Sequence, residues 1–91
     1  MKICYITKFA LEQGILEGCL VGSCIYEDGF THEKENRYLI KTEKHTYSLR
    51  REDFEYYREN AVKKAEDMRN EEIRRLEMRL NKLRQTEFSR G

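Results

Sequence analysis

The chain of 91 residues contains no proline and no tryptophan, and it has only three cysteines. Three thiols cannot all pair within one chain, and no apolar run at the N-terminus is long enough for a signal-peptide core. We therefore expect free thiols, no structural disulfide and a cytoplasmic location. No segment approaches the roughly 20 apolar residues of a membrane span, so the sequence predicts no membrane partner.

The sequence also lacks a dominant charge. Lys and Arg total 18 and Asp and Glu total 17, which gives a formal net charge of +1. This balance provides no general attraction to nucleic acid or to an anionic lipid surface. Charged residues nevertheless make up 38% of the chain, compared with roughly 25% in an average domain. Much of that charge must lie on one long solvated element.

The stretch 61–88, AVKKAEDMRNEEIRRLEMRLNKLRQTEF, has neither glycine nor proline, and apolar residues recur in it at helical spacing. It therefore predicts a long helix, which we place at 57–87. Acidic side chains interleave with the basic ones, for example Glu72 three residues before Arg75, so the bases already have partners. A helix that grips a phosphate backbone would gather Lys and Arg without acids between them. We therefore favour a solvated helix face over binding of nucleic acid.

The segments before this helix have the β-branched and aromatic composition of strands. They predict a four-stranded antiparallel meander within residues 1–50, with a mobile hairpin loop over 27–36. Gly18 and Gly22 would allow the second strand to bend sharply or a helix to approach it closely. The side chains expected to point inward from the last two strands are Tyr38, Ile40, Tyr47 and Leu49.

Together these segments predict the fold class α+β, with one domain over residues 1–91. Its parts are the β-meander at 1–50, a connector at 51–56, the long helix at 57–87 and a tail at 88–91. The meander cannot cover both of its faces, and the helix is its expected cover. A helix of this length spans roughly 45 Å, which exceeds the width of so small a domain. Part of it must therefore project.

The projecting half of the predicted helix carries an apolar seam with spacings of 3, 4 and 3 residues, namely Ile73, Leu76, Leu80 and Leu83. Such a seam is typical of pairing between helices, so we expect a homo-oligomer. The alternative is a helix that folds back and covers the seam within one chain.

Groups that could support catalysis or hold a metal are few. Cys19, Cys24, His32 and His45 include no pair at the spacing of a zinc site, and the two cysteines fall on opposite faces of a regular strand. No Ser/His/Asp or Cys/His arrangement has the context of a nucleophile. We therefore expect no metal, no cofactor and no enzymatic activity.

Two clusters could bind a partner or a ligand. The connector aromatics Phe54, Tyr56 and Tyr57, together with Phe30 in the loop, form one candidate contact surface for another protein. The other cluster contains the basic residues Arg50, Arg51 and Arg58, which beside tyrosine could stack on a base and hold a phosphate.

Two segments, ITKFALEQGI at 6–15 and the helical stretch at 61–88, resemble a group of short uncharacterised proteins from bacteriophages and prophages. Those proteins open with an Ile-Thr-Lys-aromatic-Ala-Leu strand and turn, and they close with a helix that bears Ala-Glu-x-Met-Arg, an Ile and a Leu-rich end before a final Phe. The matching residues are Ile6, Thr7, Lys8, Phe9, Ala10, Leu11, Gly14, Ile15, Ala61, Ala65, Glu66, Met68, Arg69, Ile73, Leu76, Lys82, Leu83 and Phe88. The resemblance implies a phage origin, a bacterial host and a meander followed by a helix, but no known activity.

Two functions remain open. The first is a phage or prophage accessory protein without enzymatic activity that binds a host protein and occludes it, for example a defence component. The alternative is an oligomer that sequesters a nucleotide or nucleic acid.

Overall fold

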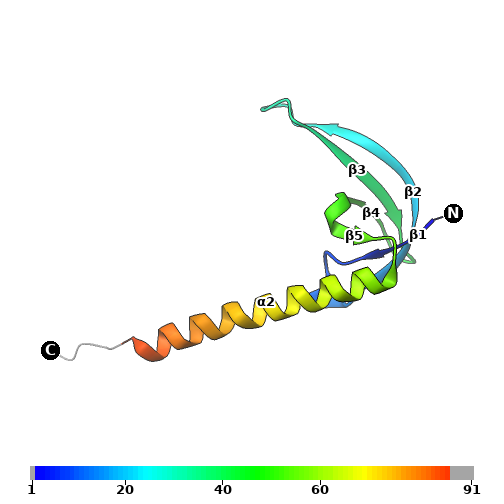
Figure 1. Ribbon diagram of the computed structural model, residues 1–91. Coiled ribbons are helices and arrows are strands. Elements are labelled where there is room, and N and C mark those ends of the chain that lie inside the picture. Colours follow the sequence, from blue (N-terminus) through cyan, green and yellow to red (C-terminus); the bar gives the residue numbers. More distant parts are fainter. Residues whose placement is uncertain (1, 87–91) are drawn as a thin grey trace.

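The structure is a computed structural model that describes residues 2–86. The tail at 88–91, Phe88 of the resemblance and the expected last helical residue at 87 lie outside the described residues. In chain order (Figure 1), the elements are β1 (Lys2–Ile6), α1 (Ala10–Gln13), β2 (Leu16–Glu27), β3 (Lys34–Lys41), β4 (Thr46–Leu49), the 3-10 turn η1 (Arg51–Asp53), β5 (Phe54–Glu55) and α2 (Arg58–Gln85).

The predicted α+β class is confirmed, but the sheet has one more strand than expected. Its order is β4-β3-β2-β1-β5 in the part of the chain that the structure describes, and every neighbouring pair is antiparallel. The extra strand, β5, has only two residues and lies within the expected connector, where Phe54 pairs with Ile6. So short a strand has no periodicity of its own, which is why the sequence does not reveal it.

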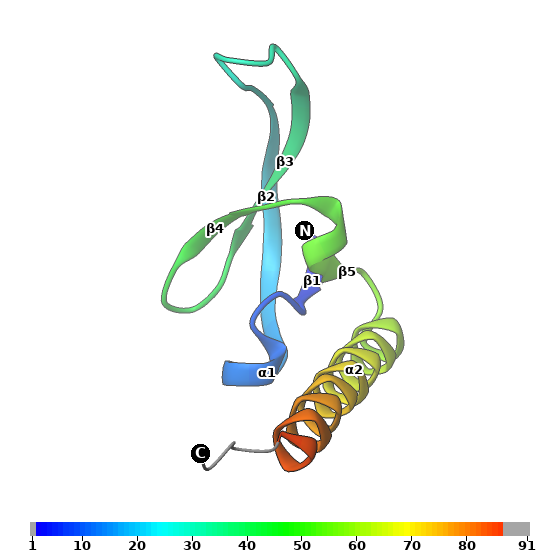
Figure 2. The ribbon, with the colours of Figure 1, turned by 90° about the vertical axis from the view of Figure 1, so that its left-hand side faces the viewer.

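The sheet rolls on itself until its two ends share one core. Tyr38 on β3 and Phe54 on β5 stand three strand positions apart, which is about 14 Å in a flat sheet. Their ring centroids are nevertheless only 5.4 Å apart. Figures 1 and 2 show the cause, because the long strand β2 curves strongly and carries β3 and β4 over β1 and β5.

Two local features of β2 produce this curvature. The pairing with β3 shifts between Leu20 and Gly22, which leaves Val21 as the extra residue of a β-bulge and increases the bend. Gly18 lies so close to β3 that an added Cβ would be 2.7 Å from Cγ2 of Ile40. The expected close approach at Gly18 therefore occurs, but the approaching element is a strand.

The core lies on the concave face of the rolled sheet and uses no residue of α2. Its buried members are Cys4, Ile6, Ile40, Leu49 and Phe54. The predicted inward positions are confirmed, because Ile40 and Leu49 are buried and Tyr38 and Tyr47 pack against this cluster. The helix is therefore not the cover of the core that we expected, since rolling closes the concave face.

Helix α2 packs instead on the convex side of the β1–β5 end. It contacts α1, β1 and β5, and Ala61 is its one buried residue among those described. Nζ of Lys64 lies 3.8 Å from Oε1 of Glu55, and the side chain of Glu55 points away from that of its neighbour Phe54. The first half of the helix thus packs on its own domain, as expected.

The second half of α2 projects away from the sheet, as Figure 1 shows. The radius of gyration is 18.7 Å, compared with about 12 Å for a compact chain of this length. No helix within residues 2–86 combines the length and the apolar composition needed to cross a membrane.

The close approach at Gly18 generates a stability prediction. In Gly18→Ala, the new methyl group would meet Ile40 and, at 2.9 Å, the backbone oxygen of Lys41. Because that oxygen belongs to a paired strand and cannot move freely, we expect the free energy of unfolding to fall by about 1–3 kcal/mol in urea titrations.

Gly22→Ala is the matched control. Its Cβ would meet only Cδ1 of Leu39, at an ordinary 3.7 Å, so its stability should change by less than about 1 kcal/mol. An equal loss in the free energy of unfolding of both variants would contradict the assignment of the bend to Gly18.

Candidate functional site

The connector aromatics do not form one surface. Phe54 is fully buried and packs edge-on against Tyr56 with ring centroids 5.4 Å apart, whereas Tyr57 is 70% exposed. Phe54 belongs to the core because its side chain lies on the same face as that of its cross-strand partner Ile6. Its prediction as a contact residue is therefore corrected, and Tyr57 is the one exposed aromatic of this group.

Phe30 is almost fully exposed and lies far from Tyr57. It sits in the loop between β2 and β3 with 96% of its surface accessible, at the opposite end of the sheet from the start of α2 (Figure 1). Asp28 organises this loop, since its carboxylate accepts hydrogen bonds from the backbone N–H of Phe30 and the hydroxyl of Thr31, both at 3.0 Å. The expected combination of loop and connector aromatics does not assemble.

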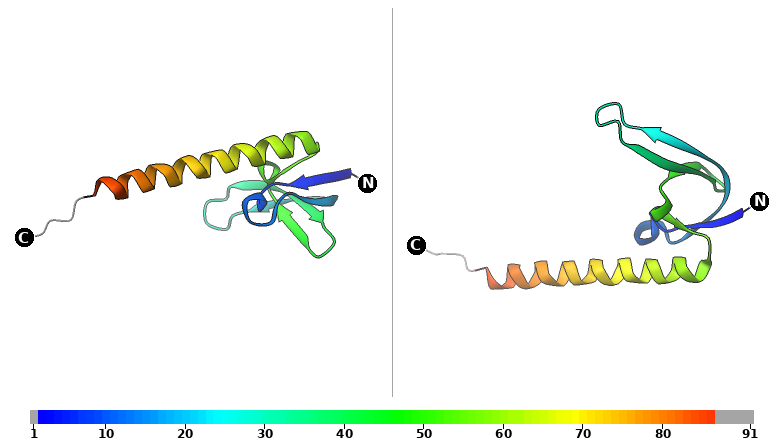
Figure 3. Two further views of the ribbon diagram at one scale, coloured as in Figure 1. Left: turned by 90° about the horizontal axis from the view of Figure 1, so that it is seen from below. Right: turned by 45° about the horizontal axis from the view of Figure 1, so that its top comes forward.

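Phe30 belongs instead to a projecting two-stranded ribbon, residues 22–38, which we call the hairpin arm. Within residues 2–86, β1 pairs with β2 only as far as Leu20, and β4 pairs with β3 only from Tyr38 onward. Both backbone edges of the arm are therefore unpaired in this range, except at Tyr38. The right-hand view of Figure 3 shows it standing away from the rest of the molecule.

The hairpin arm exposes apolar side chains besides Phe30. Ile25 is 69% exposed and Tyr26 is 55% exposed. Apolar residues stand at both even and odd positions of the stretch 15–26. That pattern is typical of a central strand with two covered faces, whereas the far half of β2 has neither face covered.

The apolar seam of α2 is exposed as well. Every described residue from Ile73 to Thr86 is solvent exposed, including the seam residues Ile73, Leu76, Leu80 and Leu83, at 46, 53, 46 and 62%. The helix does not fold back over them, so nothing in the described chain covers the seam.

The seam continues into a groove between α1 and α2. The groove is lined by Ala10, Leu11, Ile15, Val62, Ala65, Glu66 and Arg69. Val62 and Arg69 precede Leu76 by steps of seven residues, and Glu66 precedes Ile73 by the same step. One face of α2 therefore contacts α1 near the domain, and the same face is exposed to solvent in the second half of the helix.

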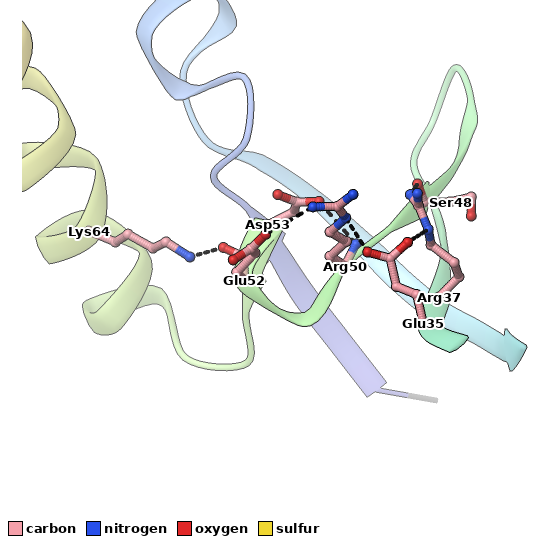
Figure 4. Close-up of polar contacts among 7 residues, drawn as sticks. All are labelled: Glu35, Arg37, Ser48, Arg50, Glu52, Asp53 and Lys64. Atoms are coloured by element: carbon pink, nitrogen blue, oxygen red, sulfur yellow. Dashed lines mark hydrogen bonds and ion pairs between the residues drawn. The ribbon is translucent and has the colours of Figure 1, made fainter. Parts of the chain in front are cut away.

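The basic cluster is already engaged with carboxylates. Arg50 forms ion pairs with Glu35 and, at 3.6 Å, with Glu52. Glu35 also accepts a 2.8 Å hydrogen bond from Nε of Arg37. Figure 4 shows these contacts as part of a polar chain from Lys64 on α2, which donates to the backbone oxygen of Glu52, to Arg37 on β3. This chain links the two ends of the rolled sheet.

Arg51 also has a structural role. Its Nη1 donates a 2.8 Å hydrogen bond to the backbone oxygen of Phe54, and its guanidinium lies 4.5 Å from the ring centroid of Tyr56. Arg58 is exposed in the first turn of α2. The shallow depression beside Arg50 and Arg51 is also lined by Glu35, Glu52 and Glu55, so its charge does not favour a phosphate.

The cysteine and histidine set does not come together. Cys19 pairs with Lys41 and Cys24 with Arg37, and these β3 partners are four positions apart, which is about 13 Å. The bulge places both cysteines on the same face, contrary to our expectation, but too far apart to share an ion. Among the described residues, no group of three or more potential ligands is placed to hold a metal ion.

Cys4 is the buried thiol of the chain. Burial in the core raises the pKa of Cys4, and the nearby positive charges of Lys2 and Arg51 only partly oppose this shift. A raised pKa keeps the thiol protonated, whereas the thiolate is the nucleophilic form. Cys4 is therefore suited to packing rather than to chemistry.

The contacts of Arg51 generate a second prediction. Arg51→Ala removes its hydrogen bond to the Phe54 oxygen and its stacking on Tyr56, so we expect a loss of about 1 kcal/mol in the free energy of unfolding. Arg58→Ala removes an exposed arginine and should change that free energy by no more than about 0.5 kcal/mol. Thermal and urea unfolding of both variants measure this difference. Unchanged stability of Arg51→Ala would contradict its structural role and favour a ligand-binding one.

Comparisons of the chain with protein-family models, with curated proteins and with solved structures find no match. The hairpin arm and the α2 seam are therefore the candidate functional surfaces of the described chain.

Proposed function

We propose that this protein is a non-enzymatic accessory protein of a bacteriophage or prophage, which acts by binding a host protein and occluding it. The hairpin arm is its contact surface for the host protein. Phage origin follows from the resemblance at residues 6–15 and 61–88, and binding follows from the shape and exposure of the arm.

One observation carries the proposal: a projecting β-ribbon presents an almost fully exposed Phe30 in the loop at its tip. A two-stranded ribbon with no third strand is at best marginally stable in water. Exposed aromatic and aliphatic side chains on it add no packing within the chain, whereas aromatic anchors supply much of the energy of protein interfaces. The unpaired backbone edges of the arm offer further hydrogen bonds to a partner strand.

The charge of the arm favours a protein partner over a nucleic acid. Acidic side chains outnumber basic ones within residues 22–38, with Glu27, Asp28, Glu33 and Glu35 against Lys34 and Arg37. Such a surface repels a phosphate backbone and complements a basic rim. The fitting partner is a protein with an apolar pocket for Phe30 and positive charge around it.

The alternative, an oligomer that sequesters a nucleotide or nucleic acid through Arg50, Arg51 and Arg58, has less support. Arg50 and Arg51 are held by carboxylates on η1, β3 and β5. A phosphate would have to displace these carboxylates, which costs about as much as the new ion pair returns.

Affinity purification from a bacterial host lysate tests the proposal when the arm is varied. We expect a stoichiometric host protein to copurify with the wild-type chain and with Tyr57→Ser, which alters an exposed aromatic outside the arm. Phe30→Ser and Ile25→Ser should weaken that binding by a factor of about 30 each, the effect of a hot spot of about 2 kcal/mol.

Three outcomes would count against the proposal. If the host protein still binds after both arm substitutions, the contact surface lies outside the arm. If only Tyr57→Ser abolishes binding, the contact surface lies at the connector. A nucleotide that copurifies without any protein, and is lost in Arg50→Ala, supports the sequestering alternative.

A further inference from the structure

We propose that residues 70–86 of α2 pair with the same segment of a second copy of this chain, and that the two helices run antiparallel. This inference does not depend on the host partner of the hairpin arm. It concerns the α2 seam, whose residues are large, apolar and exposed along one stripe of a projecting helix.

The charge pattern along α2 identifies a second copy as the occupant. The stretch 78–86 contains Arg79, Lys82 and Arg84 and no acidic residue, whereas the stretch 70–77, which it would face, has a small acidic excess, with Glu71, Glu72 and Glu77 against Arg74 and Arg75. Two such helices placed head to tail bring each basic stretch beside an acidic one. Placed head to head, they would bring like charges together.

The positions that flank the seam make the orientation specific. In heptad terms Ile73 and Leu80 are a positions and Leu76 and Leu83 are d positions, so Glu72 and Arg79 are g positions and Glu77 and Arg84 are e positions. In a parallel pair the g position of one helix meets the following e position of the other. Glu72 would then face the partner's Glu77, and Arg79 would face the partner's Arg84, so both contacts would be repulsive.

An antiparallel pair changes these contacts, because e positions then flank e positions and g positions flank g positions. Glu77 and Arg79 each lie near their own copy at the centre of the overlap, and the attractive contacts form on either side of that centre. Glu77 lies near the partner's Arg84, and helical side chains lean toward their own N-terminus, so these two lean toward each other. On the other flank, Glu72 and the partner's Arg79 are of opposite charge. Symmetry forms each contact twice.

The geometry of the single chain leaves room for this pairing. When the overlap is centred at the level of Met78, Ile73 faces the partner's Leu83 and Leu76 faces the partner's Leu80. Thr86 of the partner then reaches the level of Asn70, one residue beyond Arg69, which lines the groove with α1. The described part of the partner helix therefore ends where the domain begins.

About two heptads of overlap form a small interface, so we expect reversible dimerisation with a dissociation constant in the micromolar range. Sedimentation equilibrium of the full chain from about 5 to about 500 µM measures this constant. Leu80→Glu should remove the dimer over the whole range. Because Leu80 is 46% exposed, this variant should fold normally, and its far-UV circular dichroism should match that of the wild type at low concentration.

Exchanging the charges of Glu77 and Arg84 tests the orientation of the two helices, because parallel and antiparallel pairs predict opposite changes in the dissociation constant. Glu77→Arg and Arg84→Glu should each raise the dissociation constant about tenfold, because each replaces two attractive contacts with repulsive ones. The double variant restores opposite charges, so its constant should return to within about threefold of the wild-type value.

The opposite results would overturn the proposal. If each single variant tightens the dimer, the helices pair in parallel, because each substitution would relieve a like-charge contact. If the wild-type chain stays monomeric at all concentrations, or if Leu80→Glu still dimerises, the seam is not an interface between two copies of this chain. The seam would then be a binding surface for another protein.

Discussion

The contact between Phe54 and Tyr38 is the constraint on which the rest of the structure depends. These residues come from strands that are not neighbours, yet their ring centroids are 5.4 Å apart, so the sheet must roll to bring them together. The rolled sheet closes its own concave face, with Cys4, Ile6 and Leu49 buried around Phe54. Helix α2 therefore does not cover the core, and only its first half packs on the domain.

This arrangement leaves two apolar surfaces that the fold does not use. The hairpin arm extends past the last pairing of β1 with β2, and the α2 seam extends past the last contact with α1. They project from different parts of the molecule, and their charge patterns differ, because the arm is acidic while the helix divides into acidic and basic stretches. Because the two surfaces differ in charge pattern, we propose two different partners for them, a host protein for the arm and a second copy for the helix.

The sequence predicted the features that depend on local pattern. The period of α2 and the inward positions of β3 and β4 follow from spacing, and the projection of α2 follows from its length. Contacts between residues far apart in the sequence could not be predicted from local pattern. β5 exists only because Phe54 pairs with Ile6, and the bulge at Val21 that contributes to the roll has no signature in the sequence, although the glycines predicted a bend in this strand. The arm was missed for the same reason, since exposure of Ile25 depends on where neighbouring strands stop.

Hydrogen exchange of the full chain at several protein concentrations tests the central claim, that the domain closes without the outer half of α2. At about 5 µM, amides of residues 61–69 should be protected by packing, whereas those of 73–85 should exchange much faster, because a projecting helix frays. Raising the concentration to about 500 µM should slow exchange in 70–86 and leave β1, β3 and β5 unchanged. Uniform protection along α2 at every concentration would contradict the account, because the outer half would then be held within the single chain.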